Sequence, residues 1–145
     1  MHIYQHILLG VDFSPESDAV IEKAKEQAEH YHAKLSLIHV VDYLPPSYID
    51  DFIMPNDNLE ASLIVRSKEQ IKRLGKELNV SEKNQWVEIG SPKTEIIRLS
   101  EKEHVDLIIV GSHGRQGLQL LLGSTANAVL HSAPCDVLAV RITES

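Results

Sequence analysis

The sequence lacks the features that mark secreted and membrane proteins. It has one cysteine, Cys135, in 145 residues, so no disulfide can form within the chain. No apolar run approaches the roughly 20 residues that a membrane-spanning helix needs. The first residues lead directly into a short apolar segment and do not resemble a signal peptide. We therefore expect a cytoplasmic protein without membrane association, in which Cys135 is a small buried residue; a reactive thiol is the alternative.

Positive charge is also scarce. The chain has 14 lysines and arginines against 21 aspartates and glutamates, which gives a formal net charge of -7. Because the phosphate backbone dominates nucleic-acid binding, an acidic chain without a basic stripe is not expected to bind nucleic acid. The eight histidines do not form a metal-binding pattern. His30 and His32, for example, would lie on different faces of a helix, so no metal site is predicted.

Signatures of several enzyme classes are missing. No G-x-x-x-x-G-K-[ST] loop is present, so the chain has no P-loop lysine. No G-x-G-x-x-G follows the first apolar run, which argues against a dinucleotide dehydrogenase. No G-x-S-x-G elbow supports hydrolase chemistry. A phosphoacceptor receiver domain needs an acidic pair after its first strand, and only Asp12 stands there.

What the chain does contain is a regular alternation of short apolar runs and amphipathic segments. The runs are apolar on both faces, as buried parallel strands are, and cover residues 7–11, 35–41, 86–89, 107–110 and 137–140. Helices are expected over residues 14–31, 59–78, 91–104 and 123–133. Ser14 and Ser91 each precede a proline and are expected to cap their helices. Residues 1–145 are thus predicted to form a single doubly wound α/β domain, a parallel five-stranded sheet with helices on both faces.

The least regular segment runs from Asp42 to Asn58. It contains three prolines and three further aspartates among several apolar side chains. Loops of this length are uncommon in compact domains. We expect it to be mobile, and a lid or a contact surface for a partner is the alternative.

The stretch from Gly111 to Thr125 joins the fourth strand to the last helix. It holds four glycines, several hydroxyl residues and Arg115. Main-chain amides of such a loop and of the first turn of a helix can cradle a phosphate group. His113 could touch a base or a phosphate there, or face solvent. A tight crossover without a ligand, with Ser124 and Thr125 as helix caps, is the alternative for the whole stretch.

Asp12 directly follows the first strand. In doubly wound sheets ligands bind at the carboxyl ends of strands, where the strand order reverses. Asp12 and the glycine loop can share a ligand only if the first and fourth strands are neighbours, which favours the order 3-2-1-4-5. The Asp12 carboxylate could contact a ribose hydroxyl or a phosphate-bound cation, or it could accept a hydrogen bond from the backbone near Ser14.

The spacing Gly111-x-x-Gly114 followed by Gly123-Ser124 resembles the nucleotide-binding signature of the universal stress protein family, and the resemblance covers almost the whole chain. One departure is the spacer from Arg115 to Leu122, which has eight residues where the family usually has nine. The resemblance implies the same strand order and a bound adenine nucleotide, ATP or AMP, with Mg²⁺ on its phosphates. The implied binding residues are Asp12, Val40 through its backbone, Val110, Gly111, Gly114, Arg115, Gly123, Ser124 and Thr125.

The resemblance also implies a stress-response regulator that acts as a homodimer. The last strand, Val137 to Arg141, would be an edge of the sheet, and an apolar edge favours pairing with a second copy. A helix covering that edge is the alternative. Two other functions remain open. One is a slow ATPase in which Asp12 and a divalent ion orient water, and the other is an interaction module that binds no ligand.

Overall fold

The computed structural model describes residues 4–42, 56–112 and 124–141. These residues form a parallel five-stranded sheet in the order β3-β2-β1-β4-β5, as the sequence predicts. The strands are β1 (His6–Gly10), β2 (Lys34–Asp42), β3 (Gln85–Gly90), β4 (Leu107–Gly111) and β5 (Asp136–Val140). The helices are α1 (Ser17–Tyr31), α3 (Asn56–Leu78), α4 (Pro92–Lys102) and α5 (Ser124–Ser132), with a short 3-10 helix at Glu82–Asn84.

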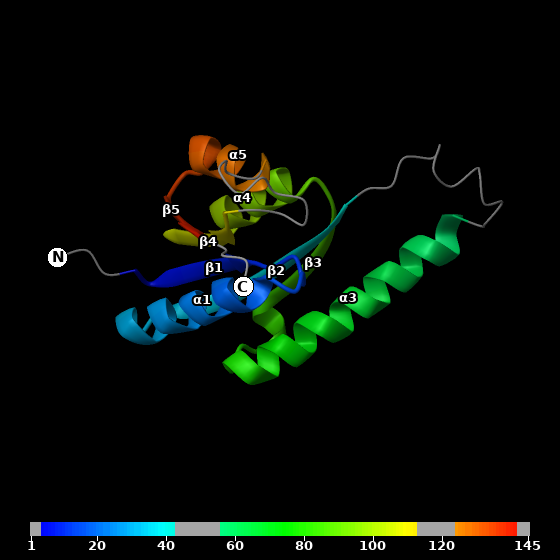
Figure 1. Ribbon diagram of the computed structural model, residues 1–145, viewed down its shortest axis with the longest axis horizontal. Coiled ribbons are helices and arrows are strands. Elements are labelled where there is room, and N and C mark those ends of the chain that lie inside the picture. The colour runs from blue at the N-terminus through cyan, green and yellow to red at the C-terminus, as the bar shows by residue number, and fades with distance from the viewer. Residues whose placement is uncertain (1–3, 43–55, 113–123, 142–145) are drawn as a thin grey trace.

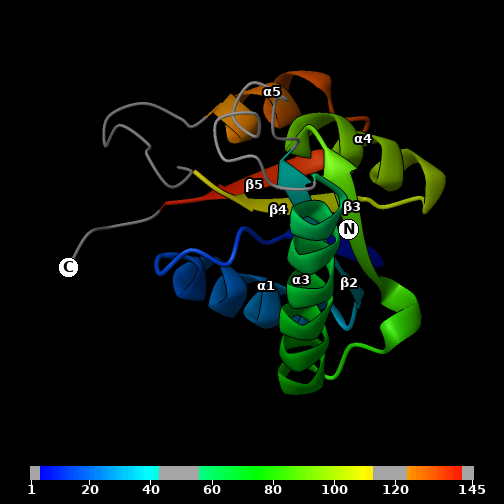
Figure 2. The same cartoon turned by 90° about the vertical axis from the view of Figure 1, so that its right-hand side faces the viewer.

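The helices cover the two faces of the sheet in pairs (Figures 1 and 2). Helices α1 and α3 lie on one face, and α4 and α5 lie on the other. Two clusters of buried side chains correspond to these faces. Ile7 and Leu9 of β1 point into the cluster under α1 and α3, and Leu8 points into the cluster under α4 and α5. The central strand is therefore apolar on both sides, which explains its unbroken apolar sequence.

The fold brings α4 close to β1 at Gly10. A Cβ atom at that position would lie 3.1 Å from Ile96 Cδ1 and 3.2 Å from Val110 Cγ1. A larger residue would push against both side chains, so glycine allows β1, β4 and α4 to pack tightly beside the carboxyl ends of the strands.

Several predicted boundaries need correction. The prediction that Ser14 caps α1 is wrong, because the helix begins at Ser17 and the N-cap residue Glu16 makes no side-chain capping bond. Ser91 does occupy the N-cap position of α4 and Pro92 its first position, but the hydroxyl makes no capping bond. The irregular segment is also shorter than expected, since Asp42 belongs to β2 and α3 already begins at Asn56.

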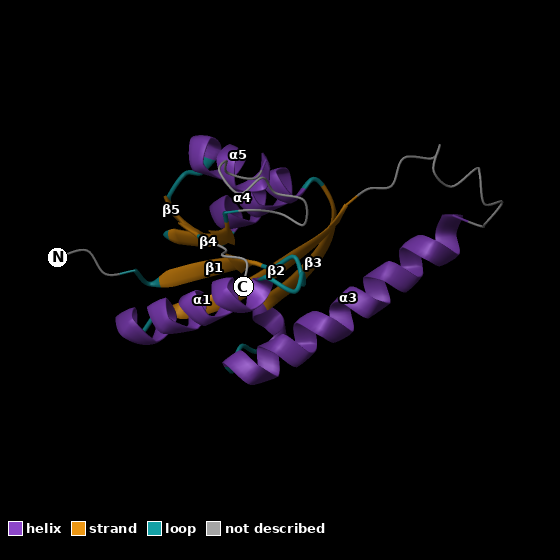
Figure 3. Ribbon diagram, viewed as in Figure 1, coloured by secondary structure: helices purple, strands orange, loops and turns teal. Residues whose placement is uncertain are grey.

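Secondary structure along the chain follows the predicted alternation closely (Figure 3). Each strand of the sheet differs from its predicted range by at most one residue at either end. Residues 43–55 lie outside the described residues, so the expectations of mobility, a lid or a contact surface stay predictions. Within the described residues, no helix is both long enough and apolar enough to cross a bilayer.

Candidate functional site

Asp12 sits in a tight turn just beyond the end of β1. Its Oδ1 accepts a hydrogen bond from the amide of Ser14 at 2.9 Å. The carbonyl of Ser14 in turn accepts hydrogen bonds from the amide of Ser17 at 3.0 Å and from its hydroxyl at 2.8 Å. The sequence left open whether this carboxylate binds backbone or ligand, and the structure shows the backbone contact through one oxygen. No hydrogen bond to Oδ2 is found within the described residues.

Phe13 has the unusual backbone conformation that makes this turn tight. Its φ angle is 57°, in the left-handed region that bulky residues rarely adopt and that costs about 1 kcal/mol or more. The side chain packs against the core cluster under α1 and α3. Its ring also lies 4.9 Å from the ring of His39, at an interplanar angle of 55°. These contacts offset the backbone strain.

Strand β2 continues past the end of β1. The amide of Lys34 donates to the carbonyl of Gln5 at 2.9 Å, and the carbonyl of Ile38 accepts the amide of Val11 at 2.9 Å, so these residues of β2 direct their main-chain groups toward β1. Main-chain groups alternate between the two sides along a strand, so Val40 also directs its N–H and C=O toward the β1 side.

Beyond Val11, however, no strand of the described residues pairs with Val40 on this side. Strand β1 ends at Gly10, and the φ angle of 57° at Phe13 does not continue an extended strand. Among the described residues, neither the N–H nor the C=O of Val40 has a hydrogen-bond partner on that side. The residue as a whole is 9% exposed, and its side chain packs in the core under α4 and α5. At this edge it is therefore the main chain of Val40, rather than its side chain, that has no partner among the described residues.

Strand β4 ends beside the same turn. Leu9 of β1 pairs with Ile109, which places Val110 and Gly111 level with the end of β1 and the turn that follows. Val110 is buried, and the amide of Ser112 donates to the carbonyl of Val140 at 2.8 Å, which ties the end of β4 to β5. Asp12, Val40, Val110 and Gly111 are thus gathered at one edge, where the strand order reverses.

Helix α5 contributes its first turn to this end of the molecule. Ser124 is exposed and Thr125 is half-buried at its start, and its first turn has no acidic residue. Figure 2 shows this first turn on the same side of the molecule as the end of β4. Its unpaired amides carry roughly half a positive charge. Gly114, Arg115 and Gly123, like His113, lie outside the described residues, so their predicted phosphate contacts stay predictions.

Titratable groups away from this edge serve the fold. Burial, with a smaller contribution from the carboxylate of Asp136, raises the pKa of the Cys135 thiol to about 11. The thiol is therefore protonated at neutral pH, which does not favour a reactive thiolate. Cys135 packs against the core as expected, but it is half-buried rather than buried. A hydrogen bond to Asp136 is the main cause that raises the pKa of Tyr4 to about 12.

Sequence reasoning missed one residue of the site, His39. Its Nδ1 lies 2.7 Å from the carbonyl oxygen of Val11, and its ring contacts Phe13. The sequence places His39 in a strand directly before Val40, which is the only local sign of a role. Its contacts depend on where β1 ends, and that cannot be seen from β2 alone.

These features define a doubly wound α/β protein whose open main-chain groups and carboxylate lie at the switch point of the sheet, where such proteins bind ligands. The chain belongs to the universal stress protein family, whose model matches residues 3–141. It is 44% identical to universal stress protein A homolog 2 of Coxiella burnetii over 146 residues, which cover 100% of both chains.

Solved structures agree with this assignment. The structure of the protein MJ0577 superposes with a TM-score of 0.82 at 29% identity and covers 99% of this chain and 100% of its own. A universal stress protein in complex with cAMP has the same fold, with a TM-score of 0.70 at 21% identity over 98% of this chain and 100% of its own. The resemblance in sequence and the predicted fold are both confirmed.

Proposed function

We propose that this protein binds an adenine nucleotide, ATP or AMP, at the carboxyl edge of β1, β2 and β4. The observation that carries the proposal is that the N–H and C=O of Val40, next to the turn that holds Asp12, have no hydrogen-bond partner toward β1 among the described residues. The edge of an adenine base carries a donor and acceptors, which the C=O and N–H of one residue can match. The complex of a family member with cAMP supports an adenine ligand for this fold.

The remaining contacts follow from the positions of the other residues. Val110 and Gly111 would lie along the base and ribose, and the free oxygen of Asp12 would meet a ribose hydroxyl or a Mg²⁺ ion held by the phosphates. The amides at the start of α5, with Ser124 and Thr125, would face the phosphates. Gly114, Arg115 and Gly123 would complete this phosphate site, a role that rests on the sequence motif.

We further propose that the protein acts as a regulatory dimer in the response to stress. Strand β5 is an edge of the observed sheet, with β4 as its single neighbour. Residues Val137 to Val140 are half-buried, and Arg141 just beyond them is exposed. Antiparallel pairing of two such edges across a two-fold axis would satisfy the main-chain groups that face away from β4.

Nucleotide binding is tested directly on the purified protein. Denaturing it and analysing the released small molecules should yield an adenine nucleotide, and calorimetric titration of the emptied protein should give a dissociation constant near ten micromolar or tighter, from about 0.3 kcal/mol for each of roughly 23 ligand atoms. No released nucleotide together with no heat of binding for ATP or AMP would overturn the proposal.

The substitution Gly114→Glu tests the phosphate site. A carboxylate there would repel the phosphates and fill space that the backbone needs, so the affinity should fall by at least about 100-fold. Circular dichroism should show an unchanged fold. Affinity equal to that of the natural protein would contradict the phosphate cradle.

A further inference from the structure

His39 lies in β2 at the point where the main-chain hydrogen bonds between β1 and β2 end. If β1 continued, the carbonyl of Val11 would accept the amide of Val40 in the regular parallel pattern. The structure shows a different partner, because Nδ1 of His39 lies 2.7 Å from that carbonyl oxygen. A carbonyl oxygen can only accept, so Nδ1 carries the proton and donates. The imidazole thus takes the place that the next residue's amide would occupy.

The same ring supports the turn that carries Asp12. It contacts Phe13, whose left-handed backbone does not continue the extended strand β1. Asp12 is the residue between the carbonyl that His39 binds and the ring that it contacts. One side chain therefore holds both neighbours of Asp12, while Asp12 itself is bound to the amide of Ser14.

We propose that His39 is a positioning residue: by occupying the Val11 carbonyl and packing on Phe13, it keeps the Val40 main chain from pairing with Val11 and holds Asp12 in place for the ligand. The imidazole itself does not contact the nucleotide. The ligand part of this inference rests on the proposed function, but the effect on the β1–β2 ladder does not. An experiment can therefore contradict the effect on ligand binding and the effect on the β1–β2 hydrogen bonds separately.

Three substitutions separate the hydrogen bond from the volume of the ring. His39→Asn keeps a donor near the position of Nδ1. His39→Leu keeps much of the volume and removes the donor. His39→Gln carries its amide farther out, near the position of Nε2, and serves as a second variant without the bond if the leucine protein does not fold. The matched control is His131→Leu, an exposed histidine at the far end of α5.

The first measurement is hydrogen exchange of the Val40 amide by NMR without nucleotide. In the natural protein this amide should exchange rapidly. In His39→Leu and His39→Gln the released Val11 carbonyl should accept it, so exchange should slow by about tenfold, the effect of one ordinary hydrogen bond. His39→Asn and His131→Leu should exchange as the natural protein does. Equal exchange in all five proteins would overturn the inference.

The second measurement is the affinity for ATP and AMP. His39→Leu and His39→Gln should bind about tenfold more weakly, because the ligand must first break the new ladder bond. His39→Asn should stay within about twofold of the natural protein. Equal weakening in the asparagine and leucine variants would overturn the positioning role. If the natural protein binds no nucleotide, the proposed function fails, and the exchange rates alone decide whether His39 holds the ladder open.

Discussion

The polar side chains at the two ends of the sheet differ in how many of their atoms form hydrogen bonds. At the amino end, His6 is 8% exposed, and both ring nitrogens are bonded, Nδ1 to the carbonyl of Glu103 at 3.0 Å and Nε2 to the hydroxyl of Ser36 at 2.7 Å. At the carboxyl end, His39 is half-buried, and Nδ1 alone has a hydrogen-bond partner among the described residues. His6 thus has both ring nitrogens bonded, whereas the main chain of Val40, next to His39, has no hydrogen-bond partner toward β1 among the described residues.

One carboxylate at each end of the sheet, Asp106 and Asp12, shows the same difference in the number of hydrogen bonds. Asp106 uses both oxygens on the backbone that leads into β1, accepting the amides of Gln5 at 2.9 Å and His6 at 3.0 Å. Asp12 uses one oxygen on the amide of Ser14. Hydrogen bonds at the amino end add stability, whereas polar groups without a partner among the described residues at the carboxyl end contribute less stability and are the ones that the proposed ligand would bind. Four predictions follow, from the largest expected effect to the smallest.

Asp106→Ala should reduce stability and leave binding intact. The change removes two charge-assisted hydrogen bonds, so the free energy of unfolding should fall by about 2 kcal/mol. Asp106→Asn retains one acceptor oxygen and should lose about half as much. Urea denaturation measures both. Nucleotide affinity should be unchanged, and a marked loss of affinity in either variant would break the contrast between the two ends.

Asp12→Asn should weaken nucleotide binding and leave stability intact. Asparagine keeps an acceptor for the amide of Ser14, so stability should hold, but the charge offered to the ligand is lost. We expect the dissociation constant to rise about tenfold, as for one hydrogen bond to a charged group. Calorimetric titration with Mg²⁺ and ATP measures this. A stable variant that binds as tightly as the natural protein would show that Asp12 serves only the turn.

The stability of the amino end should depend on pH through His6. Burial is the main cause that lowers the pKa of His6, and Lys34 lowers it further, while the carbonyl of Glu103 and the carboxylates of Glu103 and Asp106 act in the opposite direction. The folded protein thus binds a proton less readily than the unfolded chain, whose histidine titrates near 6.5. The stabilising contribution is present above that pH and is lost as pH falls toward the lower folded value.

This contribution is measured by denaturation at pH 7.5 and pH 5.5. One histidine contributes at most about 1.4 kcal/mol per pH unit. In His6→Asn, which keeps a donor for the Glu103 carbonyl, the loss between the two pH values should be smaller than in the natural protein. The same pH dependence in both proteins would mean that His6 titrates alike in the folded and unfolded states.

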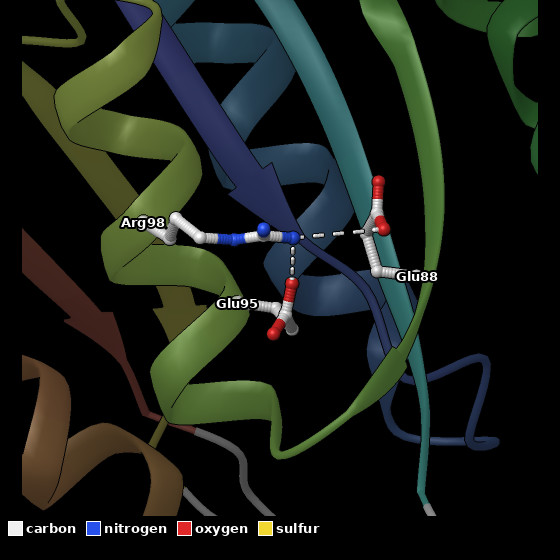
Figure 4. Close-up of polar contacts among 3 residues, drawn as sticks. All are labelled: Glu88, Glu95 and Arg98. Atoms are coloured by element: carbon white, nitrogen blue, oxygen red, sulfur yellow. Dashed lines mark hydrogen bonds and ion pairs between the residues drawn. The ribbon is translucent and has the colours of Figure 1, made fainter.

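The smallest effect is expected at an exposed group of charged side chains on α4 and β3, beside the carboxyl end of the sheet. Arg98 of α4 lies between Glu95 of the same helix, to which it is hydrogen-bonded, and Glu88 of β3 at 3.8 Å (Figure 4). The arginine side chain is 66% exposed, so solvent screens both ion pairs. Arg98→Ala should lower the free energy of unfolding by about 0.5 kcal/mol and leave affinity unchanged. A loss above about 2 kcal/mol would contradict the assignment of this group as a surface contact.

Much of the candidate site could be recognised from residue types next to predicted strand ends. Asp12 follows a buried strand, and Gly111 and Ser124 bracket a glycine-rich loop, so their positions in the sequence point to one edge of a parallel sheet. The role of Val40 cannot be recognised from its residue type, because the proposed contacts belong to the main chain and do not require a particular side chain. It was proposed from the family resemblance, and the open groups of Val40 are visible only once β1 is seen to end before it.

The sequence by itself determined the alternation of strands and helices, and it favoured the strand order through the positions of Asp12 and the glycine loop and through the family resemblance. These follow from local apolar patterns and from the requirement that strand ends meet. Only the tertiary structure decided the roles of His6, His39 and Phe13. Their contacts join residues about 30 positions apart, His6 with Ser36 and His39 with Val11, and depend on the register between strands. That register is set by packing across the whole sheet.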